Sequence, residues 1–119
     1  MVEIICCVNA HNIRGKRKTG EDMARDAEAL INSDEELSRL FGGRPTQYRK
    51  SKSLPKYTGE AARVCARINR IFFDDPGEAY RLFHELIPEA GEGVEFTPPF
   101  TVDYSIGLRI GRDTFINKD

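Results

Sequence analysis

The sequence predicts an α+β fold in which a helical region is followed by extended segments that begin a β-helix coil. Apolar residues recur at helical spacing through much of residues 19–88, whereas after Gly93 they alternate with polar residues or prolines. Near the end of the chain, Ile110 and Ile116 each begin an apolar-then-small step, and they lie six residues apart. This period is typical of β-helix coils, so we expect residues 100–119 to be extended, with both isoleucines on the same side.

Length and charge limit the class of protein. The 119 residues are 39% hydrophobic and 31% charged, which predicts one soluble domain with a single core. The net charge of −1 gives no general attraction to nucleic acid or to anionic membranes. No stretch approaches the roughly 20 apolar residues of a membrane span.

Residues 1–18 stay unassigned, and we expect them to be loosely ordered. They begin with a short apolar run compatible with a strand. Glu3 lies where a signal peptide carries basic residues, so none is predicted. The odd cysteine count, with no spacing for a disulfide framework or a zinc site, predicts a reducing cytoplasm; these cysteines are Cys6, Cys7 and Cys65.

Two helices are expected in residues 20–43. Thr19 is the predicted N-cap of the first helix. The second helix starts with a capping box that runs from Ser33 to Glu36, and Gly42-Gly43 ends it. Residues 44–57 contain two prolines and no apolar period, so they are expected to form a solvated basic loop.

Two further helices are expected in residues 59–88. Asp75 and Pro76 form a strong start for the second of them, with Glu78 reaching back as in a capping box. The apolar faces of the helices in 20–43 and 59–88 should pack into one cluster because short helices need such packing to persist. Its expected members are Ile68, Phe72, Leu82, Phe83 and Leu86.

The basic charge is concentrated in one part of the chain. Eight basic residues and one acid lie between Arg44 and Arg70, while residues 74–95 are mainly acidic. Together with Tyr48 and Tyr57, the basic stretch permits an alternative function as a small nucleic-acid-binding module, although a solvated linker has the same composition. A third alternative is a non-catalytic fragment that docks on an intact homologue.

The residues from Pro98 onward resemble a known motif. The stretches Pro98–Tyr104, Leu108–Gly111 and Phe115–Asn117 are similar to the segment with which maltose and galactoside O-acetyltransferases enter their β-helix. The resemblance is good over residues 59–119, weak over 20–43 and absent over 1–18 and 44–57. Ser105 and Gly107 depart from the family pattern.

This resemblance implies a fold and an activity. The fold would be a helical cap region over residues 19–93, followed from 94 to 119 by the first turn of a left-handed parallel β-helix. Members of this hexapeptide-repeat family transfer acetyl from acetyl-CoA to a sugar hydroxyl, and they assemble as trimers. Their catalytic histidine and acetyl-CoA groove lie in later turns. We therefore expect the chain to be inactive alone, and to associate with itself through the exposed coil edge.

The resemblance also assigns acceptor-sugar contacts. Asp103 and Asn117 fall on positions where the family contacts the sugar, and Asp34 lies near a third such carboxylate. Turn-stabilising and capping roles are the ordinary alternatives for these residues. No catalytic residue, metal ligand or cofactor-binding residue is predicted. His84 should face solvent, His11 lies in the unassigned segment, and the cysteines are expected to be incidental thiols.

Overall fold

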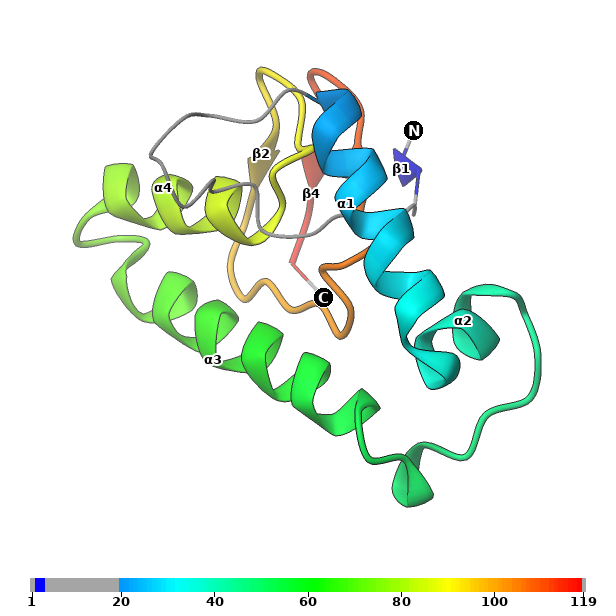
Figure 1. Ribbon diagram of the computed structural model, residues 1–119. Coiled ribbons are helices and arrows are strands. Elements are labelled where there is room, and N and C mark those ends of the chain that lie inside the picture. Colours follow the sequence, from blue (N-terminus) through cyan, green and yellow to red (C-terminus); the bar gives the residue numbers. More distant parts are fainter. Residues whose placement is uncertain (1, 4–19, 119) are drawn as a thin grey trace, which may run out of the picture.

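The computed structural model describes residues 2–3 and 20–118, and for 2–3 and 20–25 it describes only the backbone (Figure 1). About half of the described chain is helical. No helix within the described residues is long and apolar enough to cross a membrane. In chain order the elements are β1 (Val2–Glu3), α1 (Gly20–Ser33), α2 (Glu35–Phe41), the 3-10 helix η1 (Tyr48–Lys50), α3 (Leu54–Ile71), α4 (Pro76–Leu86), β2 (Glu95–Phe96), β3 (Arg109–Ile110) and β4 (Phe115–Ile116).

The break between α1 and α2 is set by Asp34. Its Oδ1 accepts hydrogen bonds from the backbone N–H of Glu36 (3.0 Å) and of Leu37 (3.1 Å), which makes it the N-cap of α2. The predicted capping box was therefore one residue out, because the Ser33 hydroxyl instead donates to the Leu30 carbonyl (2.8 Å). The double glycine ends α2 as predicted, with Gly43 at φ 69°. The predicted cap Thr19 lies outside the described residues.

Helix α3 starts earlier than the sequence pattern indicated. The expected loop over 44–57 holds η1 and also the first turn of α3, so the loop prediction was wrong at its C-terminal end. Leu54 is only 1% exposed and anchors this turn in the protein. Pro55 is tolerated beside it because the first turn of a helix needs no backbone donor there.

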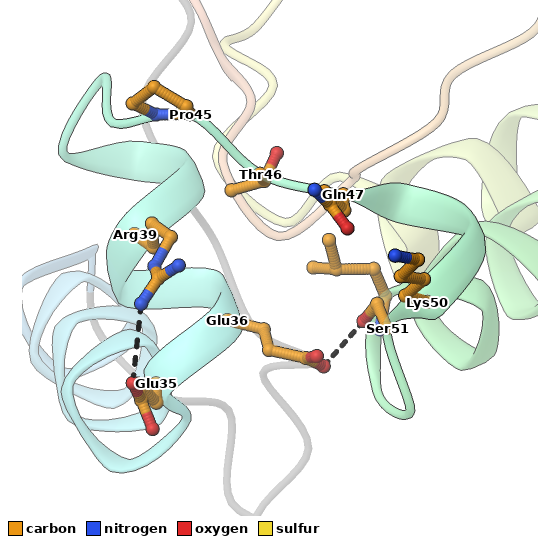
Figure 2. Close-up of a pocket in the computed structure, with 9 residues that line it drawn as sticks. Glu35, Glu36, Arg39, Pro45, Thr46, Gln47, Lys50 and Ser51 are labelled. Carbon is orange, nitrogen blue, oxygen red and sulfur yellow. Dashed lines mark hydrogen bonds and ion pairs between the residues drawn. The ribbon is translucent and has the colours of Figure 1, made fainter.

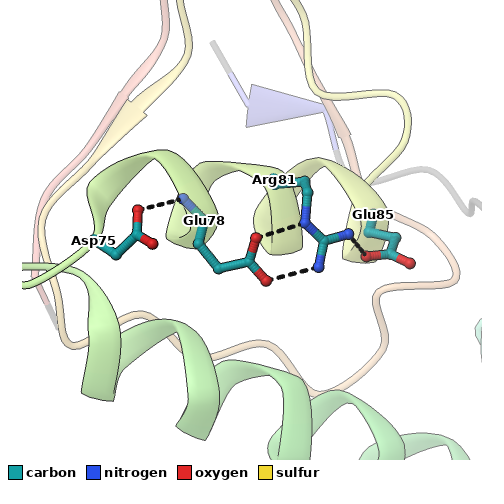
Figure 3. Close-up of polar contacts among 4 residues, drawn as sticks. All are labelled: Asp75, Glu78, Arg81 and Glu85. Atoms are coloured by element: carbon teal, nitrogen blue, oxygen red, sulfur yellow. Dashed lines mark hydrogen bonds and ion pairs between the residues drawn. The ribbon is translucent and has the colours of Figure 1, made fainter.

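Helix α4 starts where the sequence predicted. The Asp75 carboxylate accepts a hydrogen bond from the Glu78 N–H (3.1 Å), and Pro76 occupies the first helical position. Glu78 does not complete the predicted capping box. It instead pairs with Arg81, one turn further along the helix (Figure 3).

One core joins α3 and α4 to the extended segments that follow them, and the two helices lie side by side in Figure 1. Three members of the predicted cluster are buried, and Phe72 and Leu86 are partly buried against it. The residues of α1 and α2 lie outside this cluster, so the prediction was right for 59–88 and too broad for 20–43. The buried cluster consists of Cys65, Ile68, Ala79, Leu82, Phe83, Ile87, Val94, Phe96, Phe100, Leu108 and Ile110.

Two contacts fix the extended segment after α4 against the helices. The Phe83 and Phe96 rings stack with their centroids 4.7 Å apart. The Asn69 side chain of α3 hydrogen-bonds both the N–H and the carbonyl of Phe100, each at 2.8 Å. Residues 96–100 are thereby held on α3, and they lead to the segment that carries Asp103.

The extended segments form a parallel ladder with a constant register. Glu95 lies opposite Phe115, and Ala90 lies opposite Ile110, a separation of 20 residues in both cases. The two turns between these pairs match as well, since Gly93 (φ 74°) is equivalent to Asp113 (φ 54°). The positive φ of Gly93 favours glycine there, and a side chain at this position would also displace the Asp113 carboxylate.

This ladder is the only regular pairing between the segments of the predicted coil that the described residues show. Residues 100–118 contain the two short strands β3 and β4 separated by turns and irregular segments; Ile110 belongs to the core cluster, and Ile116 packs against it. A left-handed β-helix turn is not displayed and stays a prediction. The backbone edge at Arg109–Ile110 pairs antiparallel with β1, whereas Phe115 is 60% exposed. Ile110 is 2% exposed, so it belongs to the core and not to the exposed edge.

Candidate functional site

One open hollow brings a predicted site residue together with aromatic and hydroxyl side chains. It has a volume of about 580 Å³ and lies between the start of α3, η1 and the segment after Val102. We call it the Asp103 hollow. Its lining residues are Tyr48, Pro55, Thr58, Gly59, Ala62, Asp103 and Tyr104.

The side of the hollow formed by η1 is held by a hydroxyl pair. The Tyr48 phenol and the Thr58 hydroxyl lie 2.7 Å apart and share a hydrogen bond. Tyr48 is 46% exposed, so its ring remains open to solvent while its hydroxyl is fixed on α3. This arrangement presents an aromatic ring and two hydroxyls in one place.

The opposite side is formed by Asp103 and Tyr104. The Asp103 side chain is exposed, whereas Tyr104 is half-buried and packs edge-on against Phe41 of α2, with ring centroids 6.3 Å apart. Burial raises the pKa of Tyr104, and the neighbouring Tyr48 and Asp103 act in the same direction. The phenol therefore stays protonated near neutral pH and keeps a donor for a ligand.

The start of α3 is positioned by Glu36 of α2. One oxygen of this carboxylate accepts hydrogen bonds from the Ser51 hydroxyl, the Ser53 hydroxyl (2.6 Å) and the Ser53 N–H (3.0 Å). These hydrogen bonds lower the pKa of Glu36 to about 2. The Ser51 hydroxyl in turn accepts from the Leu54 N–H (2.9 Å), so Glu36 fixes the first turn of α3 and with it the position of Thr58.

A second hollow lies between α2, the loop after it and the start of α3 (Figure 2). Figure 2 shows Glu36 directed across this hollow toward Ser51, while Arg39 pairs with Glu35 at 3.5 Å. Its volume is about 560 Å³. Both carboxylates have protein partners: Glu36 connects α2 to the start of α3, and Glu35 pairs with Arg39 within α2.

The other two predicted acceptor residues do not line the Asp103 hollow. Asp34 caps α2, and it also accepts hydrogen bonds from the Ser53 hydroxyl (3.1 Å) and the Tyr57 phenol (3.4 Å). Asn117 is exposed at the end of the described chain, where its side-chain oxygen accepts from the Lys118 N–H (2.9 Å). The structure thus leaves the three predicted residues at separate places.

The histidine and the thiol of the described residues are outside the hollow. His84 is exposed on α4, as predicted, and its ring packs on Phe83. Cys65 is 2% exposed and burial raises the pKa of its thiol, so it is a poor nucleophile, also as predicted. His11, Cys6 and Cys7 lie outside the described residues. The described residues contain no group of three or more His, Cys, Asp or Glu placed to bind a metal.

Three hollow residues were absent from the predicted sugar site. Tyr48 belongs to the predicted basic stretch, and Thr58 lies between the loop expected over 44–57 and the helices expected from residue 59. Tyr104 had the one available signal, because it follows Asp103 directly in the motif. The convergence of η1 and α3 on this motif is a tertiary contact that no local pattern encodes.

Comparison of the sequence with protein-family models gives no match, and comparisons with curated proteins and with solved structures give no significant match either. The Asp103 hollow offers a carboxylate acceptor, three hydroxyl groups and two aromatic rings, but no histidine or amine that could act as a base.

Proposed function

We propose that the chain is a relative of the sugar O-acetyltransferases and that it binds the acceptor sugar in the Asp103 hollow. The observation that carries this proposal is the lining of the hollow, in which Asp103 faces the same space as Tyr48, Thr58 and Tyr104. Asp103 is also the residue to which the motif resemblance assigns an acceptor contact.

The chemistry of the hollow supports a saccharide ligand. A sugar presents hydroxyl groups, which pair with a carboxylate and with phenol or alcohol groups, and apolar C–H faces, which pack on aromatic rings. The hollow is broad and open, as is common for sites that take part of a larger saccharide. Weak binding is expected, because few of these side chains are buried before the ligand arrives.

Acetyl transfer itself needs a base and a thioester site in addition to acceptor binding. The Asp103 hollow supplies neither, so in this proposal the chain provides acceptor recognition and does not acetylate sugars alone. In the family, acetyl-CoA binds to later turns of the β-helix, which also carry the catalytic histidine. The same proposal includes self-association through the edge at Phe115, since members of the family assemble as trimers. It also includes a cytoplasmic location.

The test is ligand binding followed by NMR chemical shifts. We expect maltose, methyl β-galactoside or glucose to shift the amide signals of Thr58 and Tyr104 with millimolar affinity, and Asp103→Asn to weaken binding about tenfold, because one charge-assisted hydrogen bond is lost. Asp74→Asn is the matched control, since Asp74 is an exposed carboxylate away from the hollow.

Two results would contradict this proposal. One is the absence of shifts around the hollow with all three sugars in folded protein. The other is equal weakening by Asp103→Asn and Asp74→Asn. Acetylation of a sugar by the isolated chain with acetyl-CoA would contradict the division of roles, provided that a substitution within residues 1–119 abolished it.

A further inference from the structure

Helix α3 carries a row of basic side chains along its exposed face. Lys56, Arg63, Arg67 and Arg70 are all exposed, and their spacings of seven, four and three residues place them on one side of the helix. We call this row the cationic ridge. At about 1.5 Å per residue it extends about 21 Å along α3.

The ridge lacks the ion pairs that other arginines of this protein form. Among arginines whose side chains are described, each one outside residues 44–70 has a carboxylate partner; the pairs are Arg39–Glu35, Arg81–Glu78, Arg81–Glu85, Arg109–Glu89 and Arg112–Glu92. Within the described part of the chain, no cation between Arg44 and Arg70 has such a partner. Glu60, the single acid of the ridge face, is not within ion-pair distance of Arg63.

The arrangement is unfavourable for the isolated helix. Arg67 lies four residues after Arg63 and three before Arg70, so like charges are neighbours on both sides. Such pairs destabilise a helix, whereas opposite charges at the same spacing stabilise it. An anionic ligand would remove this repulsion and provide the missing partners.

The ridge borders the Asp103 hollow. A side chain at Gly59, which lines the hollow, would come within 3.8 Å of the Arg63 guanidinium. Arg63 therefore lies at the rim of the hollow, and Arg67 and Arg70 continue away from it along α3. A ligand that leaves the hollow in this direction meets a guanidinium at successive turns.

We propose that the ligand of the hollow is an acidic saccharide, one whose sugar unit lies against Asp103 and whose carboxylates or other anionic groups pair with Arg63, Arg67 and Arg70. This inference rests on the proposed function for the hollow itself. Guanidinium groups suit this ligand because they bind planar carboxylates with two parallel hydrogen bonds.

The hollow favours a saccharide over a nucleic acid. A DNA backbone offers no hydroxyl donor to the Asp103 carboxylate that lines the hollow, whereas each unit of an acidic saccharide does. Binding to oligonucleotides is therefore an outcome that the experiment must distinguish.

The probes are trigalacturonic acid and its fully methyl-esterified form, which share the same hydroxyl pattern but differ in charge. Titration at low ionic strength should show the acid binding about tenfold more tightly than the ester, since each exposed charge pair contributes only a modest free energy. In the triple variant R63Q/R67Q/R70Q this ratio should fall close to one while ester binding stays unchanged. The triple variant R44Q/K50Q/K118Q removes three exposed cations outside the ridge and should keep the ratio.

Thermal melts establish that both triple variants are folded, and the remaining outcomes then separate the two proposals. An acid-to-ester ratio that survives in R63Q/R67Q/R70Q overturns the role of the ridge. Tighter binding of a decathymidylate than of trigalacturonic acid overturns the saccharide assignment in favour of nucleic acid. Binding of the acid that depends on the ridge but is unaffected by Asp103→Asn supports the ridge and overturns the proposed function of the hollow. Failure of both probes to bind overturns the acidic-saccharide proposal, whereas the proposed function is decided by the three neutral sugars.

Discussion

Helices α3 and α4 pack against each other in one core, but their exposed arginines differ in whether they form ion pairs. On α4, Arg81 donates hydrogen bonds to both carboxylate oxygens of Glu78, each at 2.7 Å, and to Glu85 at 2.8 Å (Figure 3). On α3, Arg63, Arg67 and Arg70 face solvent without an ion pair among the described residues. Arg81 lowers the pKa of Glu78, which indicates an attractive local field on α4.

This difference separates charge that stabilises a helix from charge that does not. The acids around Arg81 lie three residues before it and four residues after it, which are the spacings that support a helix. Around Arg67 the neighbours four residues before and three residues after are arginines, Arg63 and Arg70. Since exposed pairs contribute little, α3 can carry this arrangement without unfolding, and the ridge remains available to a ligand.

The two helices also start differently. Helix α4 is capped by the side chain of its N-cap residue Asp75, whereas the side chain of Ser53, the N-cap residue of α3, forms no capping hydrogen bond. Its first turn is held instead by Glu36 of α2, through Ser51 and Ser53. The start of α3, which bears the ridge and the hollow, is therefore held by a residue of another helix. The start of α4 is held by its own N-cap residue.

The largest expected effect comes from the core that both helices share. Phe83 is fully buried between α4 and the extended segments, so Phe83→Ala should reduce the free energy of unfolding by about 3–5 kcal/mol. Urea denaturation measures this change. Phe73→Ala is the control: Phe73 is 82% exposed, and its removal should change stability by less than about 0.5 kcal/mol. Similar losses for the two variants would contradict the core assignment.

A smaller effect concerns the anchored start of α3. The pKa of Glu36 is lowered from 4.5 to about 2, so its stabilising contribution is complete above pH 4.5 and is lost as the pH falls toward about 2. Glu36→Gln should therefore lower Tm by about 4 °C at neutral pH, and the difference from the native protein should shrink on acidification.

Thermal melts of the two proteins across this pH range test the anchor. Glu78 also has a lowered pKa, but it titrates in both proteins and cancels in the difference. A Tm difference that stays constant down to pH 2 would show that the Glu36 carboxylate does not anchor α3 in its charged form.

The helices could be predicted from sequence because their signals are local. Asp75 and Pro76 identify the start of α4, and the apolar spacing that includes Ile68 identifies the buried face of α3. The start of α3 could not be predicted, because Leu54-Pro55 has the pattern of a loop until Leu54 is buried by other elements. The cap at Asp34 was missed by one residue since Ser33 and Asp34 offer equivalent local chemistry.

The candidate site was less predictable, because it depends on contacts across the chain. Asp103 came from a motif resemblance and lines the hollow, but nothing local indicates that Tyr48 and Thr58 would meet it there. Asp34 has a capping role that its position before α2 explains. The 20-residue register between Glu95 and Phe115 was equally hidden, since a six-residue apolar period does not specify which segments pair.

The smallest expected effect is the sharpest test of the difference between α3 and α4. Arg67→Gln removes two like-charge contacts on α3 and one weak attraction to Glu78, so it should raise Tm by about 1 °C at low ionic strength. Arg81→Gln removes the attractions to Glu78 and Glu85, so it should lower Tm by about 2 °C. Salt screens exposed charges, and both shifts should diminish as salt is added. The two substitutions are chemically identical and lie on neighbouring helices, so the general effect of replacing arginine by glutamine is the same in both. Shifts of the same sign would mean that the ridge is stabilised by partners that its geometry does not reveal, and the case for an anionic ligand on α3 would lose its electrostatic basis.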